Sequence, residues 1–158
     1  MEPRRRRPSF PAAYGISSDE IGMLEWTWAE AQLAAARNYW VVTASAPWGP
    51  HAVPVWGLWH AGAIVFSTSP QSRKARDLAA DPRVVVHLES GDDVVIVEGL
   101  AEPAEATPEV VDAYERKYAF RPEEGGAGWH RVVPARAYAW REESYTLTAT
   151  GFDWRPPG

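Results

Sequence analysis

Apolar residues recur along the chain with the spacing of two kinds of secondary structure. Short stretches dense in valine, isoleucine and aromatic residues, bounded by glycine, proline or aspartate, are typical of β-strands. They predict seven strands, over residues 39–46, 51–60, 63–69, 83–89, 94–105, 131–142 and 145–154. Stretches rich in alanine, glutamate and leucine predict three helices. These cover residues 26–38, 71–80 and 107–120.

Local signals fix several boundaries of these elements. Thr107 is a good N-cap for the third helix, because Pro108 follows at the first helical position. Thr27 is the candidate N-cap of the first helix. Pro54 lies inside a predicted strand and has no backbone N–H to donate, so that strand requires a sheet edge or a bulge.

The order of the elements predicts the fold class. Most consecutive strands are separated by short turns, and the first three should form a meander. This order favours an antiparallel sheet that curls into a barrel, with about three helices at its ends: a mainly β protein with α. We expect one domain over residues 20–155, preceded by a flexible N-terminal tail over residues 1–19.

The distribution of charge argues against nucleic acid as the main partner. The net charge is −5, and the first seven residues, with four arginines and one glutamate, carry +3, which leaves −8 for the rest. Binding to a phosphate backbone requires a basic face, which an acidic folded part does not offer. The apolar stretch of an export signal is missing and no run is long enough to cross a membrane, so we expect a cytoplasmic protein.

Composition excludes several kinds of site. The chain has no cysteine, so it forms no disulfide, thiolate metal site or cysteine nucleophile. Its four histidines lack metal-ligand spacing, and its paired acidic residues are adjacent, which on a strand turns them to opposite faces. The nine tryptophans exceed what one small core requires and suggest an oligomer interface or a flat aromatic ligand.

The stretch STSPQSRKARDL, residues 67–78, gathers hydroxyls and then cations at a strand-to-helix junction. Arg73, Lys74 and Arg76 oppose the helix dipole, whose positive end lies at the N-terminus. One interpretation is a solvated helix start whose cations reach nearby aspartates or water. The other is a phosphate site, because backbone N–H groups and hydroxyls at such a turn add donors.

A second stretch, VPVWGLW over residues 53–59, also has two interpretations. Its apolar side chains alternate between the two faces of a strand and are most simply explained as core packing. The functional alternative places this strand against a flat ring.

The chain presents, in order, a strand, a turn, a second strand, hydroxyls, the motif SRKA, a helix and the motif DPRVVV. This order resembles that of the flavin-binding split-barrel proteins, the pyridoxamine-phosphate-oxidase-like superfamily. The resemblance runs from about Trp26 to Trp154. It implies an antiparallel, Greek-key-like split β-barrel and a homodimer with cofactor sites at the subunit interface.

The resemblance also implies a cofactor site. Ser67 and Thr68 match the hydroxyl pair at a strand end, Arg73 and Lys74 match the cations on the cofactor phosphate, and Ser72 adds a donor. The stretch from Val53 to Trp56 matches the strand along the isoalloxazine ring, and residues 94–102 resemble a strand that borders the pocket. The cofactor-binding residues implied are Val53, Pro54, Val55, Trp56, Ser67, Thr68, Ser72, Arg73 and Lys74. No metal site and no catalytic acid or base is implied.

Two departures change the expected activity. Pyridoxamine-phosphate oxidases begin the ring-contacting strand with arginine and end in a basic strand, whereas this chain has AVPVWG and TGFDWRPPG. Vitamin B6 oxidation is therefore not expected. The stretches PVW and RKARDLAADPRV look more like a branch that uses coenzyme F420, or in some members FMN, and the missing arginine slightly favours F420. We expect an oxidoreductase for a small organic substrate; the alternative is a non-catalytic carrier of a flavin or other planar cofactor.

Overall fold

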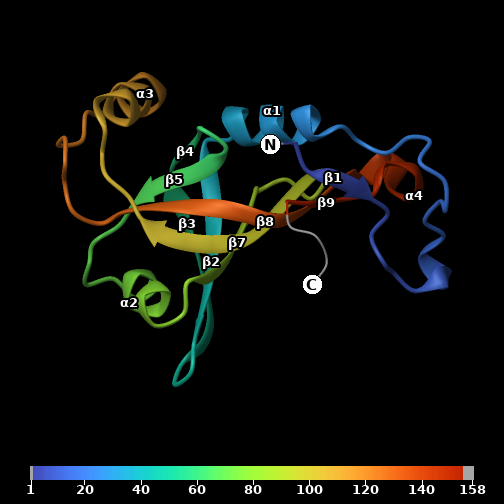
Figure 1. Cartoon of the computed structure of the whole chain (residues 1–158), viewed down its shortest axis with the longest axis horizontal. Helices are drawn as coiled ribbons and strands as arrows, with labels where there is room; N and C mark the ends of the chain where they lie inside the picture. Colours follow the sequence, from blue (N-terminus) through green and yellow to red (C-terminus); the bar gives the residue numbers. More distant parts are fainter. Residues whose placement is uncertain (1, 155–158) are drawn as a thin grey trace.

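The computed structural model describes residues 2–154, and within them one antiparallel sheet of nine strands dominates the fold (Figure 1). The strands are β1 (Arg4–Arg6), β2 (Asn38–Ser45), β3 (Gly49–Trp56), β4 (Leu58–His60), β5 (Ala63–Ser67), β6 (Arg83–His87), β7 (Asp93–Pro103), β8 (Trp129–Arg141) and β9 (Thr150–Asp153). The helices are α1 (Trp26–Ala35), α2 (Arg73–Ala80), α3 (Pro108–Tyr118) and α4 (Tyr145–Thr148), with short 3₁₀ helices η1 (Ala12–Tyr14) and η2 (Glu142–Ser144).

The sheet curls without closing. Its strands follow the order β1-β9-β8-β7-β6-β2-β3, and β5 joins β8 on a branch that also carries β4. The helices lie around the curled sheet, with α1 against β4 and β7, α3 against β4, and α2 against β2 (Figure 1). This arrangement confirms a mainly β, antiparallel split barrel.

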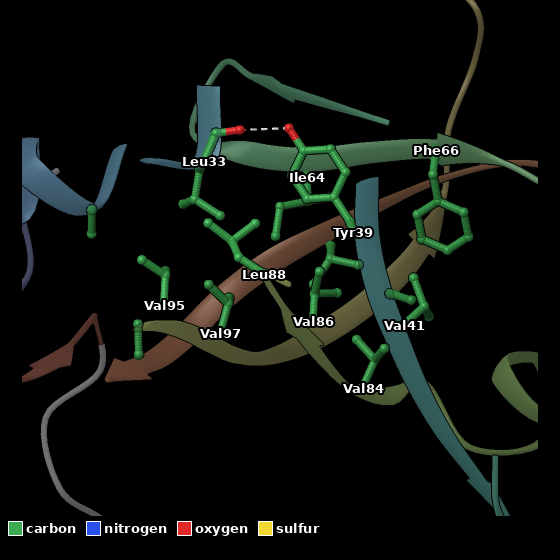
Figure 2. Packing of buried hydrophobic residues seen from close by; sticks show 14 of the residues in the cluster. Leu33, Tyr39, Val41, Ile64, Phe66, Val84, Val86, Leu88, Val95 and Val97 are labelled. Carbon is green, nitrogen blue, oxygen red and sulfur yellow. Dashed lines mark hydrogen bonds between the residues drawn. The ribbon is translucent and has the colours of Figure 1, made fainter. Parts of the chain in front are cut away.

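Alternation along the strands builds the core. Alternate residues of β6 and β7, among them Val86 and Val97, are fully buried between the sheet and α1 (Figure 2). Tyr39 of β2 is also fully buried, and its hydroxyl donates to the carbonyl oxygen of Leu33 in α1 at 2.6 Å (Figure 2). One hydrogen bond thus satisfies a polar atom in the apolar interior, where an unpaired one is costly.

Two boundary predictions are confirmed. The side chain of Thr107 caps α3, accepting from the backbone N–H of Val110 at 3.3 Å. Strand β3 is the last strand of the sheet and pairs with β2 alone among the described strands, so Pro54 lies on an edge as its missing N–H requires.

Two boundaries of the first elements differ from the sequence prediction. Helix α1 begins at Trp26 after Glu25, so Thr27 lies inside its first turn and caps nothing. The first three predicted strands pair consecutively, as a meander requires, but the strand over residues 51–60 breaks at Gly57, so that β3 pairs with β2 and β4 pairs with β5. At Gly57 the chain passes so close to Val65 that a Cβ would lie 2.9 Å from the Val65 carbonyl oxygen.

The last predicted strand, over residues 145–154, is also shorter than expected. Its first half forms helix α4, in which the hydroxyl of Thr148 donates to the carbonyl oxygen of Ser144 at 2.9 Å. A hydroxyl that bonds the backbone of its own segment competes with strand pairing. Only Thr150–Asp153 joins the sheet, and residues 155–158, where the predicted domain ends, lie outside the described residues.

The N-terminal segment differs from the expected flexible tail. Residues Arg4–Arg6 form strand β1, which pairs with β9 at the edge of the sheet. The guanidinium of Arg6 lies 2.6 Å from a carboxylate oxygen of Asp153, and that of Arg7 donates to several backbone carbonyls. The arginine run therefore completes the sheet. Among residues 2–154, no helix combines the length and apolar character needed to cross a bilayer.

Candidate functional site

The junction between β5 and α2 gathers the predicted hydroxyls. Ser67 is the last residue of β5, and Ser72 caps α2, its Oγ accepting from the backbone N–H of Ala75 at 3.2 Å. The hydroxyl oxygens of Thr68 and Ser72 lie 3.0 Å apart. The turn therefore places hydroxyl groups beside the positive end of the helix, where an anion is stabilised.

The glycine-rich loop before β8 fixes this junction from the other side. The backbone N–H of Thr68 donates to the carbonyl oxygen of Gly128 at 3.0 Å. Gly128 has φ +90°, and a Cβ there would lie 2.1 Å from the Thr68 carbonyl oxygen. Only glycine permits this approach, a role that the sequence did not reveal because residues 68 and 128 lie far apart along it.

Arg73 joins α2 to the hairpin between β2 and β3. Its Nη2 donates to the carbonyl oxygens of Trp48 at 3.2 Å and Gly49 at 3.3 Å. Its Nε lies 3.7 Å from Oδ2 of Asp77, beyond hydrogen-bond range, and this buried Nε has no hydrogen-bond acceptor among residues 2–154. The Nη2 group of Arg73 therefore binds the hairpin, while its Nε–H donor has no acceptor among the described residues.

Asp77 supplies the negative charge beside Arg73. It is buried, and Thr43 donates a hydrogen bond to its Oδ2 at 2.9 Å. Burial by itself raises the pKa of this carboxyl, but the hydrogen bond from Thr43 and the positive charge of Arg73 outweigh it and leave the pKa below its ordinary value. Asp77 therefore remains an anion and offsets part of the charge of Arg73.

Lys74 differs from its neighbour. It is half-buried and makes no ion pair within residues 2–154, and its partial burial lowers its pKa. Arg76, one turn further along α2, is exposed to solvent. Of the cations predicted here, Lys74 is the half-buried one that no carboxylate of the described chain balances.

Strand β3 runs past this junction. Pro54 and Trp56 are exposed on one face, and Val53 and Val55 are half-buried on the other. Strand β3 also contacts β5, whose end carries the hydroxyls. The strand that carries the predicted ring-binding residues therefore lies close to the strand that ends at the hydroxyls.

A cluster around Trp56 was missed by the sequence analysis. Its ring stacks on that of Tyr118 in α3, with centroids 4.5 Å apart and an interplanar angle of 3°. The guanidinium of Arg37 lies 5.5 Å from the Trp56 ring centroid. Lys117 donates to the carbonyl oxygen of Gly57 at 2.8 Å, and burial together with the charge of Arg37 lowers the pKa of Lys117 to about 8.

A large hollow is lined by other residues than those predicted to bind a cofactor. It has a volume of about 1310 Å³ and opens on the outward faces of β2, β6, β7 and β8. Apolar side chains such as Leu100 and Trp140 line it together with arginines and carboxylates. None of the nine residues predicted to bind a cofactor contributes to its lining.

A family model described as pyridoxamine 5′-phosphate oxidase matches residues 28–141. The chain belongs to the pyridoxamine 5′-phosphate oxidase family. The match covers both β3 and the β5–α2 junction, and it confirms the resemblance expected from the sequence. No curated protein matches the chain.

Solved structures share the fold of this family member at low identity. A conserved hypothetical protein of Mycobacterium tuberculosis is 22% identical, with a TM-score of 0.66 over 88% of this chain and 95% of its own. A structure described as an F420 reductase is 18% identical, with a TM-score of 0.54 over 68% of this chain and 94% of its own. An FAD-binding protein of Mesorhizobium loti is 16% identical, with a TM-score of 0.55 over 84% of this chain and 96% of its own.

Proposed function

We propose that this protein is a flavin- or deazaflavin-dependent oxidoreductase that transfers a hydride to a small organic substrate. Coenzyme F420 is slightly favoured as the cofactor, and FMN is the alternative. The observation that carries the proposal is Lys74, a half-buried cation without a carboxylate partner in residues 2–154, at the start of a helix whose cap and preceding turn supply hydroxyls. Family membership and an F420 reductase of the same fold support it.

The donors at the β5–α2 junction fit a cofactor phosphate. The buried Nε of Arg73 has no hydrogen-bond acceptor among the described residues, and a phosphate oxygen would provide one. Lys74 would supply charge, and Thr68 and Ser72 would supply hydroxyl donors. Since Arg73 also ties α2 to the neighbouring hairpin, it would orient the site as well as contact the phosphate.

Strand β3 would hold the ring system. Its outer edge has no strand partner among the described strands, so its backbone groups can pair with the polar atoms of a flat heterocycle. Val53 and Val55 would give the ring an apolar surface that excludes water. When bound, the cofactor supplies the hydride chemistry, and the chain supplies orientation, charge and a dry environment.

The alternative is a binding protein that carries a flavin or another planar cofactor without turnover. The FAD-binding protein of the same fold supports this alternative. A purified sample that binds cofactor tightly yet reduces no acceptor across a broad panel would favour it over the enzyme.

Substitution of the phosphate-binding cations tests the cofactor site. We expect Lys74→Ala to weaken binding of FMN or coenzyme F420 by about 10- to 100-fold, because it removes a charge-assisted contact. The double variant Arg73→Ala/Lys74→Ala should abolish it. Binding is measured by quenching of tryptophan fluorescence, and circular dichroism verifies that each variant is folded.

Arg76→Ala is the matched control, since it removes an exposed cation from the same helix. It should bind cofactor as the wild type does. An unchanged affinity in a folded double variant would contradict the proposed site.

We also propose that the protein is a homodimer and that a second copy covers the large hollow. Arginines and carboxylates line that surface together, among them Arg83, Asp81, Arg136 and Glu98. An interface with a twofold axis brings a surface against itself, so a patch that carries both signs of charge can be complementary to its own copy. In this arrangement the partner would also complete the cofactor pocket beside β3.

A further inference from the structure

A small hollow at the outer side of α1 is separate from the features above. Its volume is about 180 Å³, and it lies between α1, the turn after β4 and the two ends of the described chain. It is lined by Glu2, Trp26, Glu30, Trp59, Gly62 and Trp154. Pockets for drug-sized ligands have volumes of about 300–1,000 Å³, so this one suits only a small head group.

Three tryptophans form the walls of this hollow. The Trp26 ring meets that of Trp59 at 70°, with centroids 5.9 Å apart, and that of Trp154 at 86°, with centroids 4.6 Å apart. These edge-to-face contacts hold the three rings together, and each of the three rings also borders the hollow. Trp26 is buried in the core and anchors the group, whereas Trp59 and Trp154 are half-buried.

Two carboxylates complete the lining. Glu30 follows Trp26 by one turn of α1, so the two side chains lie on the same face of that helix. Glu2 approaches from the N-terminal segment. Neither carboxylate forms an ion pair with the rest of residues 2–154, where other surface carboxylates such as Glu25 do. The hollow is therefore negative and aromatic at once.

We propose that these five residues, Trp26, Trp59, Trp154, Glu2 and Glu30, form an aromatic cage for a small soluble methylated ammonium compound. The face of an indole ring is negative and attracts a cation, most strongly when water is excluded. A strongly hydrated ion such as sodium would lose its water against the three rings, whereas a methylated ammonium group is weakly hydrated and packs its methyl groups on them. The carboxylates supply the opposite charge.

The cage is independent of the proposed cofactor site. It shares no residue with the β5–α2 junction or with residues 53–56 of β3. Its variants can therefore be tested whether or not the protein binds a flavin.

Titration of the full chain with choline tests the cage. In spectra of ¹⁵N-labelled tryptophan side chains, we expect choline to shift the signals of Trp26, Trp59 and Trp154 saturably. The uncharged isostere 3,3-dimethylbutan-1-ol should bind at least about tenfold more weakly, because it keeps the shape and loses the cation.

Variants of the half-buried residues separate charge from shape. Glu30→Gln should weaken choline binding by about tenfold, and Trp59→Leu should abolish it. The matched controls are Glu89→Gln and Trp48→Leu, which change exposed residues outside the cage and should leave the affinity within about twofold of wild type. Circular dichroism verifies folding, and retention of choline affinity in a folded Trp59→Leu variant would overturn the proposal.

Arg155 follows Trp154 in the sequence and lies outside the described residues. The titration is therefore repeated with Arg155→Ala, which removes a cation that the chain itself could supply. Saturable choline binding in either background supports the cage. Its absence in both, equal binding of the uncharged isostere, or binding to phosphatidylcholine vesicles without binding of free choline would each overturn it.

Discussion

At the scale of single residues, the two lysines of the chain have different surroundings. Lys74 lies at a helix start without an ion-pair partner in residues 2–154, whereas Lys117 donates to the Tyr39 hydroxyl at 3.0 Å and to the carbonyl oxygen of Gly57 at 2.8 Å. Burial lowers the pKa of both amines, and for Lys117 the nearby charge of Arg37 lowers it further, to about 8. A lysine is therefore a candidate anion ligand in one place, and in the other it links α3 to β2 and to the bend at Gly57.

The lowered pKa of Lys117 predicts a pH-dependent stability. An unfolded lysine has a pKa of about 10.4, so between about pH 8 and pH 10 the unfolded chain binds more protons than the folded one. The penalty for burying the charge is present in full below about pH 8 and is relieved as the pH rises, so the free energy of unfolding should increase across this window. Lys117→Met should flatten the increase, as measured by urea unfolding at about pH 7.5 and pH 9.5.

Lys74→Met is the control for this measurement, since it removes the other lysine. It should keep the part of the increase that Lys117 causes. Burial raises the pKa of Tyr39 above its ordinary value, so this tyrosine lowers stability from about pH 10 upward, where it ionises in the unfolded chain, and the upper measurement stays below that pH. A slope that is the same in wild type and Lys117→Met would contradict the assignment.

At the scale of elements, α2 and α3 begin in the same way but carry different charges. Each is capped by a hydroxyl, that of Ser72 in α2 and that of Thr107 in α3. The first turn of α3 holds Glu109, which complements the helix dipole, whereas α2 begins with Arg73 and Lys74, which oppose it. An anion bound at the start of α2 would offset this unfavourable interaction between the cations and the helix dipole. Helix α3 has no such interaction to offset, because Glu109 already complements its dipole.

Removing each cap separates stability from binding. Ser72→Ala and Thr107→Ala should each lower the free energy of unfolding by about 1 kcal/mol, because each leaves a backbone N–H without its acceptor. Ser72→Ala should in addition weaken cofactor binding, because its hydroxyl belongs to the proposed phosphate site. The measurements are urea unfolding and cofactor titration, and an equal effect of both variants on cofactor affinity would argue against a role for Ser72 in binding.

At the scale of the whole molecule, the sheet has two faces with different partners. The inner faces of β6 and β7 join the core, where β7 packs on α1, while their outer faces line a hollow of about 1310 Å³ with apolar and charged residues. Phe10, Tyr138 and Trp140 also line it, which gives part of the aromatic excess a location outside the core. A surface of this kind on a small protein is typical of an interface.

A charge introduced into this surface should disrupt the proposed dimer. We expect sedimentation velocity to show a dimer for the wild type and a monomer for Leu100→Asp, whose side chain is 37% exposed in the hollow. Cofactor affinity should fall with dissociation, because the partner would complete the pocket. Ile21→Asp, at a position that is 77% exposed and outside the hollow, is the control and should remain dimeric. A monomeric wild type would contradict the proposal.

Several features of the fold could be predicted because their causes are local. Pro54 required an edge strand, Thr107 and Pro108 required a helix start, and both are found where the sequence placed them. The wrong boundaries have causes outside the local sequence. Gly57 ends a strand because the chain there passes close to Val65, and the arginine run joins the sheet because β9 offers it an edge.

The candidate site shows the same division. The run of hydroxyls and cations in residues 67–78 could be recognised from sequence, because helix capping and charge near a helix end depend on neighbouring residues. The support from Gly128 and the engagement of Arg73 by the β2–β3 hairpin could not, because they join segments that are tens of residues apart.

The sequence by itself determined the identity and most boundaries of the strands and helices, the antiparallel class and the family. Those properties follow from periodicity, caps and short motifs, which act within a few residues. The tertiary structure alone decided which strands meet, which of the cations in residues 67–78 is already paired, how far the pKa of Lys117 falls and which tryptophans surround one hollow. Each of these depends on burial and distance between remote segments, which exist only once the sheet has curled.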